Sequence, residues 1–291
     1  MKNQSSSAGI LWIIAAVGCL ALHDSIARQM VLGLPLAVVI WIRYLGQATV
    51  MSATALARGK IDAWRCHKPV VHLARAVFLV ALSLTFMGGL RYVPLAQSTA
   101  LLFLAPLFVL VISRLVFDEQ VRLIQWLAVV GGLAGVYLVI QPGAGHFDWN
   151  YLWPCAGAFF LSCYQLATRM GARFDNAESA TLWLGLYATL LCSLIIPWYW
   201  QSPSPTQWIG LIGMGCIGSL AHWFFATAYS KASPALLAPF TYVQVPFSAL
   251  LGFVFFSSLP TPSAWAGIAL IMLSGLIVAL PDNKRRAHTL A

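Results

Sequence analysis

The sequence predicts an all-α integral membrane protein with ten transmembrane helices, arranged as two inverted five-helix repeats. Three observations lead to this fold class. The 291 residues are 60% hydrophobic and 9% charged, whereas soluble domains carry about 25% charged residues. Apolar runs of about 20 residues, the length that crosses a bilayer, recur along the whole chain. A pattern of prolines and glycines also recurs after 140 residues.

Each predicted helix is long enough to cross a hydrocarbon core of about 30 Å. Short polar or Pro/Gly-rich joints separate the helices, such as Gln-Ser-Pro-Ser-Pro at 201–205. No joint is long enough for a domain outside the membrane. The ten predicted helices cover residues 9–27, 35–57, 69–90, 95–115, 122–140, 151–169, 178–200, 207–229, 235–256 and 262–280.

The Lys and Arg residues behind the net charge of +9 are divided unevenly between the two sides of the predicted helices. If the N-terminus is cytoplasmic and the sides alternate, 13 of the 17 Lys and Arg residues fall on the cytoplasmic side. Arg28 and Arg91 fall on the outer side, and Arg43 and Arg75 fall inside helices, with Arg75 close enough to the cytoplasm to reach lipid headgroups. This positive-inside bias predicts that both termini are cytoplasmic. The bilayer is then the partner of the basic loops, and no nucleic-acid partner is predicted.

An internal repeat divides the chain into residues 9–140 and 150–280. Its strongest evidence is the similarity of RYVPLAQSTALLFLAPLFVLVI at 91–112 to KASPALLAPFTYVQVPFSALLG at 231–252. At an offset of 140 the matched pairs are Arg91 and Lys231, Pro94 and Pro234, Pro106 and Pro246, and Gly135 and Gly275. Because five is an odd number, the second repeat enters the membrane the other way up, as in many secondary transporters.

Pro106 and Pro246 lie in the middle of predicted helices. A proline in a helix frees a backbone carbonyl and bends the helix, which is tolerated where that group faces protein or water. Two interpretations are open: a kink that serves packing, and a hinge that shapes or gates a central cavity. The matching positions in the two repeats favour the hinge.

Polar side chains inside the first two helices form the first group of cavity candidates. A charge within a bilayer needs a partner or a function. Asp24 and Arg43 are predicted at similar depth, so the sequence predicts an ion pair between them. The pair either holds the two helices together or lines the cavity and binds solute. Gln47 lies one turn from Arg43 on the same helical face and extends this polar surface.

The second repeat supplies further cavity candidates. Tyr242 and Gln244 precede Pro246, and they line the cavity or form hydrogen bonds between helices. His222 is either a proton-coupling site, because its charge changes near neutral pH, or a neutral histidine in the core. Gly131 and Gly135 form a G-x-x-x-G that allows close helix packing, within one chain or in a homodimer.

The motifs of other function classes are missing from the sequence. It contains no G-x-x-x-x-G-K-[ST], H-E-x-x-H or G-x-S-x-G, so nucleotide hydrolysis and enzymatic activity are not predicted. The six cysteines are scattered and predict neither a disulfide framework nor a metal site. No cofactor is expected. An inverted repeat favours alternating access over a fixed channel pore.

Residues 91–121, RYVPLAQSTALLFLAPLFVLVISRLVFDEQV, and residues 239–256, PFTYVQVPFSALLGFVFF, resemble the signature of the drug/metabolite transporter superfamily in its ten-span EamA-type branch. The resemblance implies a secondary transporter of small organic metabolites in the bacterial inner membrane, most commonly an exporter of amino acids. It also implies a cavity built from spans 1–4 and 6–9. LHDSIARQM at 22–30 and VVIWIRYLGQ at 38–47 look closer to members linked with uptake of S-adenosylmethionine or riboflavin.

Overall fold

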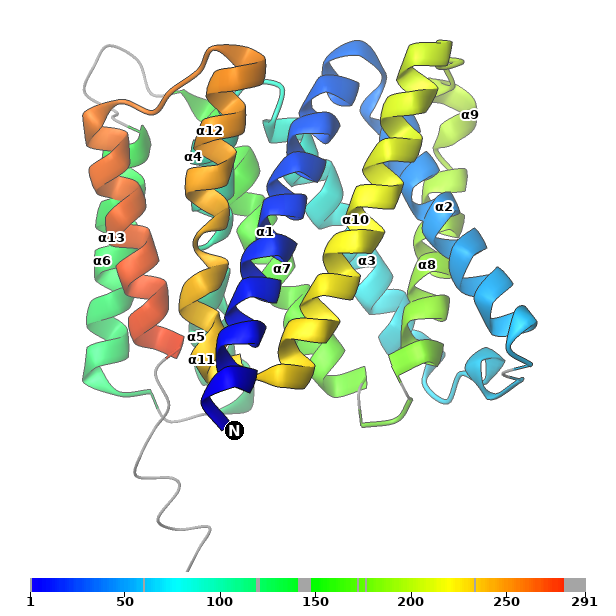
Figure 1. Cartoon of the computed structure of the whole chain (residues 1–291), viewed down its shortest axis with the longest axis horizontal. Helices are drawn as coiled ribbons and strands as arrows, with labels where there is room; N and C mark the ends of the chain where they lie inside the picture. The colour runs from blue at the N-terminus through cyan, green and yellow to red at the C-terminus, as the bar shows by residue number, and fades with distance from the viewer. Residues whose placement is uncertain are drawn as a thin grey trace, which may run out of the picture.

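The computed structural model describes residues 2–59, 61–118, 121–140, 148–171, 173–175, 177–232 and 234–279. These residues form helices without strands, and most helices run roughly along one common direction (Figure 1). The α-helices are α1 (Lys2–Gly33), α2 (Leu36–Ala57), α3 (Pro69–Gly89), α4 (Leu95–Leu102), α5 (Ala105–Phe117), α6 (Leu123–Ile140), α7 (Leu152–Gly171), α8 (Ala177–Ser193), α9 (Ile196–Tyr199), α10 (Pro205–Lys231), α11 (Pro234–Thr241), α12 (Gln244–Phe256) and α13 (Pro262–Ala279). Two short 3₁₀ helices are η1 (Ile61–Trp64) and η2 (Trp149–Tyr151).

Seven helical segments among the described residues are long and apolar enough to cross a membrane. The chain is therefore a multi-pass membrane protein. The seven segments are Ser7–Gly33, Leu36–Ala57, Pro69–Gly89, Leu95–Phe117, Leu123–Ile140, Pro205–Lys231 and Pro239–Phe256. A shorter apolar segment covers Pro262–Val278. The predicted spans 151–169 and 178–200 correspond to α7 and α8, which are not among these seven segments. Polar residues such as Ser162, Thr168 and Glu178 make these two helices less apolar.

Helix α1 is longer than the predicted span 9–27 and ends at Gly33. Asp24 therefore lies more than two turns before the end of the helix, deeper than the sequence indicated. Arg28 was predicted just beyond the first span, but it belongs to α1, with its guanidinium over the Phe256 ring at 4.4 Å. The apolar residues that follow Arg28 continue the helix past it, which explains the difference.

The two predicted spans with a proline in the middle, 95–115 and 235–256, are each broken into two helices. Leu102 ends α4 and Ala105 begins α5, while Thr241 ends α11 and Gln244 begins α12. Proline has no N–H, so Pro106 cannot bond to the carbonyl of residue 102, nor Pro246 to that of residue 242. The chain tightens there into i→i−3 bonds, as from the Leu104 N–H to Leu101 O at 3.1 Å. The predicted kinks are thus present in both halves of the chain.

The strongest helix–helix packing joins α1–α6 to α7–α13. The main pairs are α1 with α10, α3 with α7, α6 with α13 and α2 with α8, followed by α1 with α12, α3 with α8, and α4 with α12. Figure 1 shows α6 and α13 together at one edge of the molecule. There, a Cβ on Gly267 would lie 2.5 Å from the Gly135 carbonyl oxygen, so both positions need glycine. The close packing predicted at Gly135 is found within one chain.

Candidate functional site

Asp24 joins the two halves of the chain through a buried hydrogen-bond network. Gln244 Nε2, from the first residue of α12, donates to Asp24 Oδ2 at 3.1 Å. The neighbouring His23 Nδ1 donates to Asp24 Oδ1 at 3.0 Å. Both His23 and Asp24 are buried. The break at Thr241–Gln244 starts α12 at this depth, so the helix break places the amide that holds the carboxylate.

The predicted ion pair between Asp24 and Arg43 is wrong. Arg43 instead faces α3, where its Nη1 donates to Ser83 Oγ at 3.3 Å and lies 4.0 Å from the Met87 sulfur. Its guanidinium also stands 5.4 Å from the centre of the Tyr44 ring. The two charges lie at a similar depth. However, α2 directs Arg43 toward α3, whereas α1 directs Asp24 toward α12.

The other predicted cavity residues divide into two groups. His222, on α10, is exposed and lies within electrostatic reach of Arg43 and His23. Gln47 is half-buried one turn beyond Arg43. Tyr242 lies elsewhere: its ring is 4.5 Å from that of Phe103, and its hydroxyl packs against Gly275 of α13. Tyr242 therefore fills the space between the two helix breaks, while Asp24, Arg43, His222 and Gln244 gather around α1, α2, α10 and α12.

Aromatic side chains surround this polar region. Trp41, Tyr164 and Tyr187 pack against the same core cluster that contains Tyr44. Trp41 Nε1 donates to Ser193 Oγ of α8 at 2.8 Å. Trp183 and Tyr187 lie ring to ring at 5.4 Å. Flat rings of this kind suit stacking against a planar aromatic solute.

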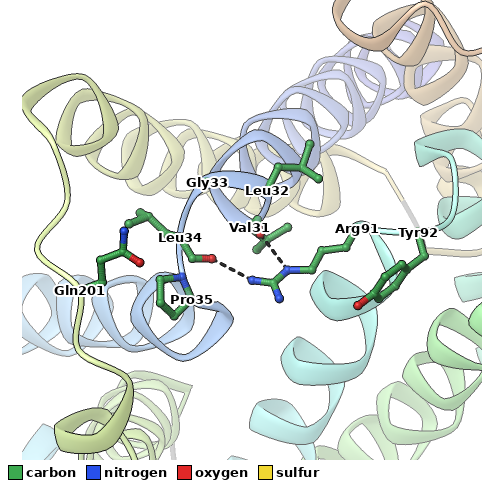
Figure 2. Close-up of a pocket in the computed structure, with 8 residues that line it drawn as sticks. All are labelled: Val31, Leu32, Gly33, Leu34, Pro35, Arg91, Tyr92 and Gln201. Carbon is green, nitrogen blue, oxygen red and sulfur yellow. Dashed lines mark hydrogen bonds between the residues drawn. The ribbon is translucent and has the colours of Figure 1, made fainter.

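An open hollow lies at the end of the bundle where α1 finishes and α4 begins. Its volume is about 460 Å³. Figure 2 shows the Arg91 guanidinium in the hollow, where Nε donates to Val31 O and Nη2 to Leu34 O, both at 2.8 Å. These carbonyls belong to the last turn of α1 and to the residue beyond it, so the cation caps the helix. The remaining lining residues are Leu32, Gly33, Pro35, Tyr92 and Gln201.

A second polar cluster, buried except for the side chain of His67, lies at the opposite end of the bundle, where α3 begins and α7 ends. We call His67, His72, Arg75 and Asp175 the Asp175 cluster. Asp175 accepts hydrogen bonds from the His67 N–H at 3.1 Å, from His67 Nδ1 at 2.7 Å and from His72 Nε2 at 2.9 Å. Burial alone raises the pKa of Asp175, but the hydrogen bonds from His67 and His72 outweigh it and lower the pKa well below its usual range.

The direction of these bonds is fixed by Arg75. An arginine only donates, so the contact of 2.8 Å between Arg75 Nη1 and His72 Nδ1 makes that nitrogen the acceptor. The proton of a neutral His72 is then on Nε2, where it points to Asp175. Arg75 also bonds to Thr168 Oγ1 and Ala180 O. It is 4% exposed, so its predicted contact with lipid headgroups is wrong.

Cys66, His72 and Asp175 have their ligand atoms within 4.8 Å of one another, a grouping that could hold a metal ion and that the sequence did not indicate. A metal on His72 Nε2 would need the proton on Nδ1 and an acceptor beside it. Arg75 offers a donor at that place. The arrangement therefore suits a hydrogen-bonded connection from Arg75 through His72 to Asp175 rather than a metal centre.

Several residues of these sites were missed by sequence reasoning. Ser83 and His72 are buried polar residues of α3, which reads as an ordinary apolar span. Asp175 stands in a short polar joint and reads as a solvated turn. Only His23 had a signal, because it is adjacent to Asp24 in the sequence.

The model of the EamA-like transporter family matches this chain twice, over residues 7–141 and 148–280. The chain belongs to this family. The resemblance to the drug/metabolite transporter superfamily is therefore confirmed.

Curated relatives of the chain are named as transporters. A riboflavin transporter from Vibrio cholerae is 30% identical over 282 residues, covering 95% of this chain and 94% of that protein. A riboflavin transporter from Rhizobium johnstonii is 28% identical, covering 95% and 92%. An S-adenosylmethionine uptake transporter from Rickettsia prowazekii is 21% identical, covering 95% and 94%. A solved crystal structure covers 100% of this chain and 99% of its own with a TM-score of 0.61 and 22% identity, which supports the fold alone.

Proposed function

We propose that this chain is a secondary-active transporter that takes up riboflavin, or a closely related planar heteroaromatic solute, across the bacterial inner membrane. The observation that carries the proposal is the hydrogen bond from Gln244 to Asp24. It joins the two halves of the chain beside a helix break, among the cationic and aromatic side chains of α2 and α8. The names of the relatives favour this alternative over the amino-acid export that the resemblance first implied.

Ten spans in two inverted repeats complete the proposal. The two family matches have nearly the same limits as the predicted repeats, 9–140 and 150–280. Helix pairing also keeps its pattern when the halves are exchanged: α1 on α10 corresponds to α7 on α3, and the pairs α2–α8 and α6–α13 correspond to themselves. The left-handed residues Asp118 and Ser257, 139 residues apart, end α5 and α12 in the same way. A transporter of this construction alternates access about a site between its halves.

The positive-inside bias orients the proposed transporter. It assigns both termini and the Asp175 cluster to the cytoplasm, and the Arg91 hollow to the outer face. A green fluorescent protein fused to the C-terminus tests this orientation, because the protein fluoresces in the cytoplasm but not after export in unfolded form to the outer side. A dark fusion with normal protein level would contradict it.

The polar groups suit the edge of a flavin ring, which presents carbonyl oxygens on both sides of an N–H group. Arg43 and Gln244 offer donors to the carbonyls, and Asp24 offers an acceptor to the N–H. A second candidate solute is S-adenosylmethionine. The specific observation in its favour is the presence of one carboxylate, Asp24, and one guanidinium, Arg43, in the same region, which would complement its cationic and carboxylate groups.

Uptake by purified protein in proteoliposomes tests the proposed function directly. Radiolabelled riboflavin should enter the vesicles without ATP when an ion gradient is present, and unlabelled riboflavin should compete with it. Competition by S-adenosylmethionine alone would select the second candidate. Efflux of preloaded amino acids, with no entry of either solute, would overturn the proposal and support amino-acid export instead.

We also propose that Pro106 and Pro246 are hinges for alternating access, because each stands at the start of the helix that resumes after a break. Pro246→Leu restores an N–H donor and is expected to straighten the joint, which slows turnover by about 10-fold, equivalent to about 1.4 kcal/mol in the barrier. Pro262→Leu is the control, because Pro262 occupies the first position of α13, where no N–H donor is needed. The measurement is the initial uptake rate per molecule of inserted protein. Equal turnover of the Pro246→Leu variant and the native protein would exclude the hinge.

A further inference from the structure

Arg43 is a cation in the middle of a membrane-spanning helix, and its surroundings do not neutralise it. A charge at this depth is costly unless it is paired or has a function. Among the described residues, no carboxylate lies within 4.0 Å of its guanidinium. Its contacts are the Ser83 hydroxyl, the Met87 sulfur and the Tyr44 ring.

The hydrogen bonds beneath Arg43 have only one consistent set of directions. The Tyr44 hydroxyl lies 3.0 Å from Leu79 O and 2.5 Å from Ser83 Oγ. The carbonyl can only accept, so the Tyr44 O–H must donate to Leu79 O. The Ser83 O–H then donates to Tyr44 Oη. Ser83 has used its proton, and its lone pairs face the Arg43 N–H.

This chain of three bonds holds Arg43 by one nitrogen. Tyr44 is 0% exposed and Ser83 is 3% exposed, so the support is rigid and dry. Only Nη1 of Arg43 has a hydrogen-bond partner among the described residues. Nε and Nη2 therefore keep unused N–H groups in the plane of the guanidinium. These parallel donors fit two adjacent oxygen or nitrogen acceptors on a flat solute.

We propose that Ser83 and Tyr44 are positioning residues, which fix the orientation of Arg43 so that the other edge of its guanidinium binds the acceptor edge of the solute. This inference rests on the proposed function and specifies the solute group: a carbonyl oxygen next to a second acceptor, as on the pyrimidine-like ring of a flavin. Arg43 touches the solute, whereas Ser83 and Tyr44 act through Arg43.

Riboflavin binding to detergent-solubilised protein, followed by quenching of riboflavin fluorescence, tests the inference together with uptake kinetics. Ser83→Ala and Tyr44→Phe are each expected to weaken binding by about 10-fold and to raise KM by the same factor, with kcat within about 2-fold of the native value. Because both residues act in one chain, the double variant should be no worse than either single variant.

Ser162→Ala is the matched control, since Ser162 is a buried serine of α7 that bonds to the Phe159 carbonyl and does not contact Arg43. It should bind riboflavin as the native protein does. Arg43→Lys keeps the charge but removes the planar fork, and it should lose at least as much affinity as Ser83→Ala.

The outcomes separate this inference from the proposed function. If the native protein does not bind riboflavin, the proposed function fails. If the native protein binds and the Ser83→Ala and Tyr44→Phe variants bind equally well, only the positioning role is overturned. Additive losses in the double variant would also overturn it, because they would show two independent effects.

Discussion

Replacing Gln244 with leucine is expected to reduce solute uptake by at least 10-fold at unchanged protein level. The substitution removes the donor from α12 and leaves the buried Asp24 carboxylate with His23 as its only hydrogen-bond partner among the described residues. A hydrogen bond to a charged group contributes about 1.5–3 kcal/mol, and a loss of 1.4 kcal/mol corresponds to about 10-fold. Initial uptake rates in proteoliposomes measure the effect.

A double-mutant cycle shows whether the bond itself matters. Asp24→Asn should also reduce uptake by at least 10-fold. The Asp24→Asn, Gln244→Leu double variant should lose no more uptake than the more damaging single variant, because both changes remove the same hydrogen bond. The control is Gln165→Leu, an exposed glutamine of α7. Fully additive losses would mean that Asp24 and Gln244 act separately, for example on different parts of the solute.

Asp175→Ala is expected to lower the free energy of unfolding by about 3 kcal/mol, since it removes the acceptor of three hydrogen bonds and leaves the His72 Nε2 donor buried without its acceptor. Thermal unfolding in detergent, followed by tryptophan fluorescence, measures the change. Asp62→Asn is the control, because Asp62 pairs with Arg65 at an exposed position where an ion pair contributes about 0–1 kcal/mol. A drop no larger than that of the control would refute this role for the cluster.

The loss of unfolding free energy in Asp175→Ala should depend on pH, because it reflects the charge of the Asp175 carboxylate. The pKa of Asp175 is lowered in the folded protein, so its stabilisation is complete above the ordinary carboxyl pKa of about 4 and is lost as the pH falls toward the folded value. The difference in unfolding free energy between the native protein and Asp175→Ala should therefore narrow as the pH falls below about 4. A constant difference down to about pH 3 would indicate that packing, and not charge, is lost.

Much of the architecture is determined by properties that act locally along the chain. Hydrophobic runs identify membrane helices because the cost of exposing backbone and polar groups to lipid depends on composition within about 20 residues. Pro106 and Pro246 break their helices because a missing N–H acts within one turn. The sequence therefore predicted helix positions, the two breaks and the transporter family. It placed the end of α1 too early, since apolar residues after Arg28 allow the helix to continue.

The partners of the polar side chains were decided only by the tertiary structure. Asp24, Arg43, Gln244 and His222 were all recognised as candidates, yet Asp24 bonds to a residue 220 positions away and not to Arg43. Arg75 was predicted at the lipid surface, but it is buried against His72 and Ala180. The physical reason is that a hydrogen bond depends on direction and on tenths of an ångström. These are set by how α1, α3, α7 and α12 rotate and pack against one another, and no local property of the sequence contains them.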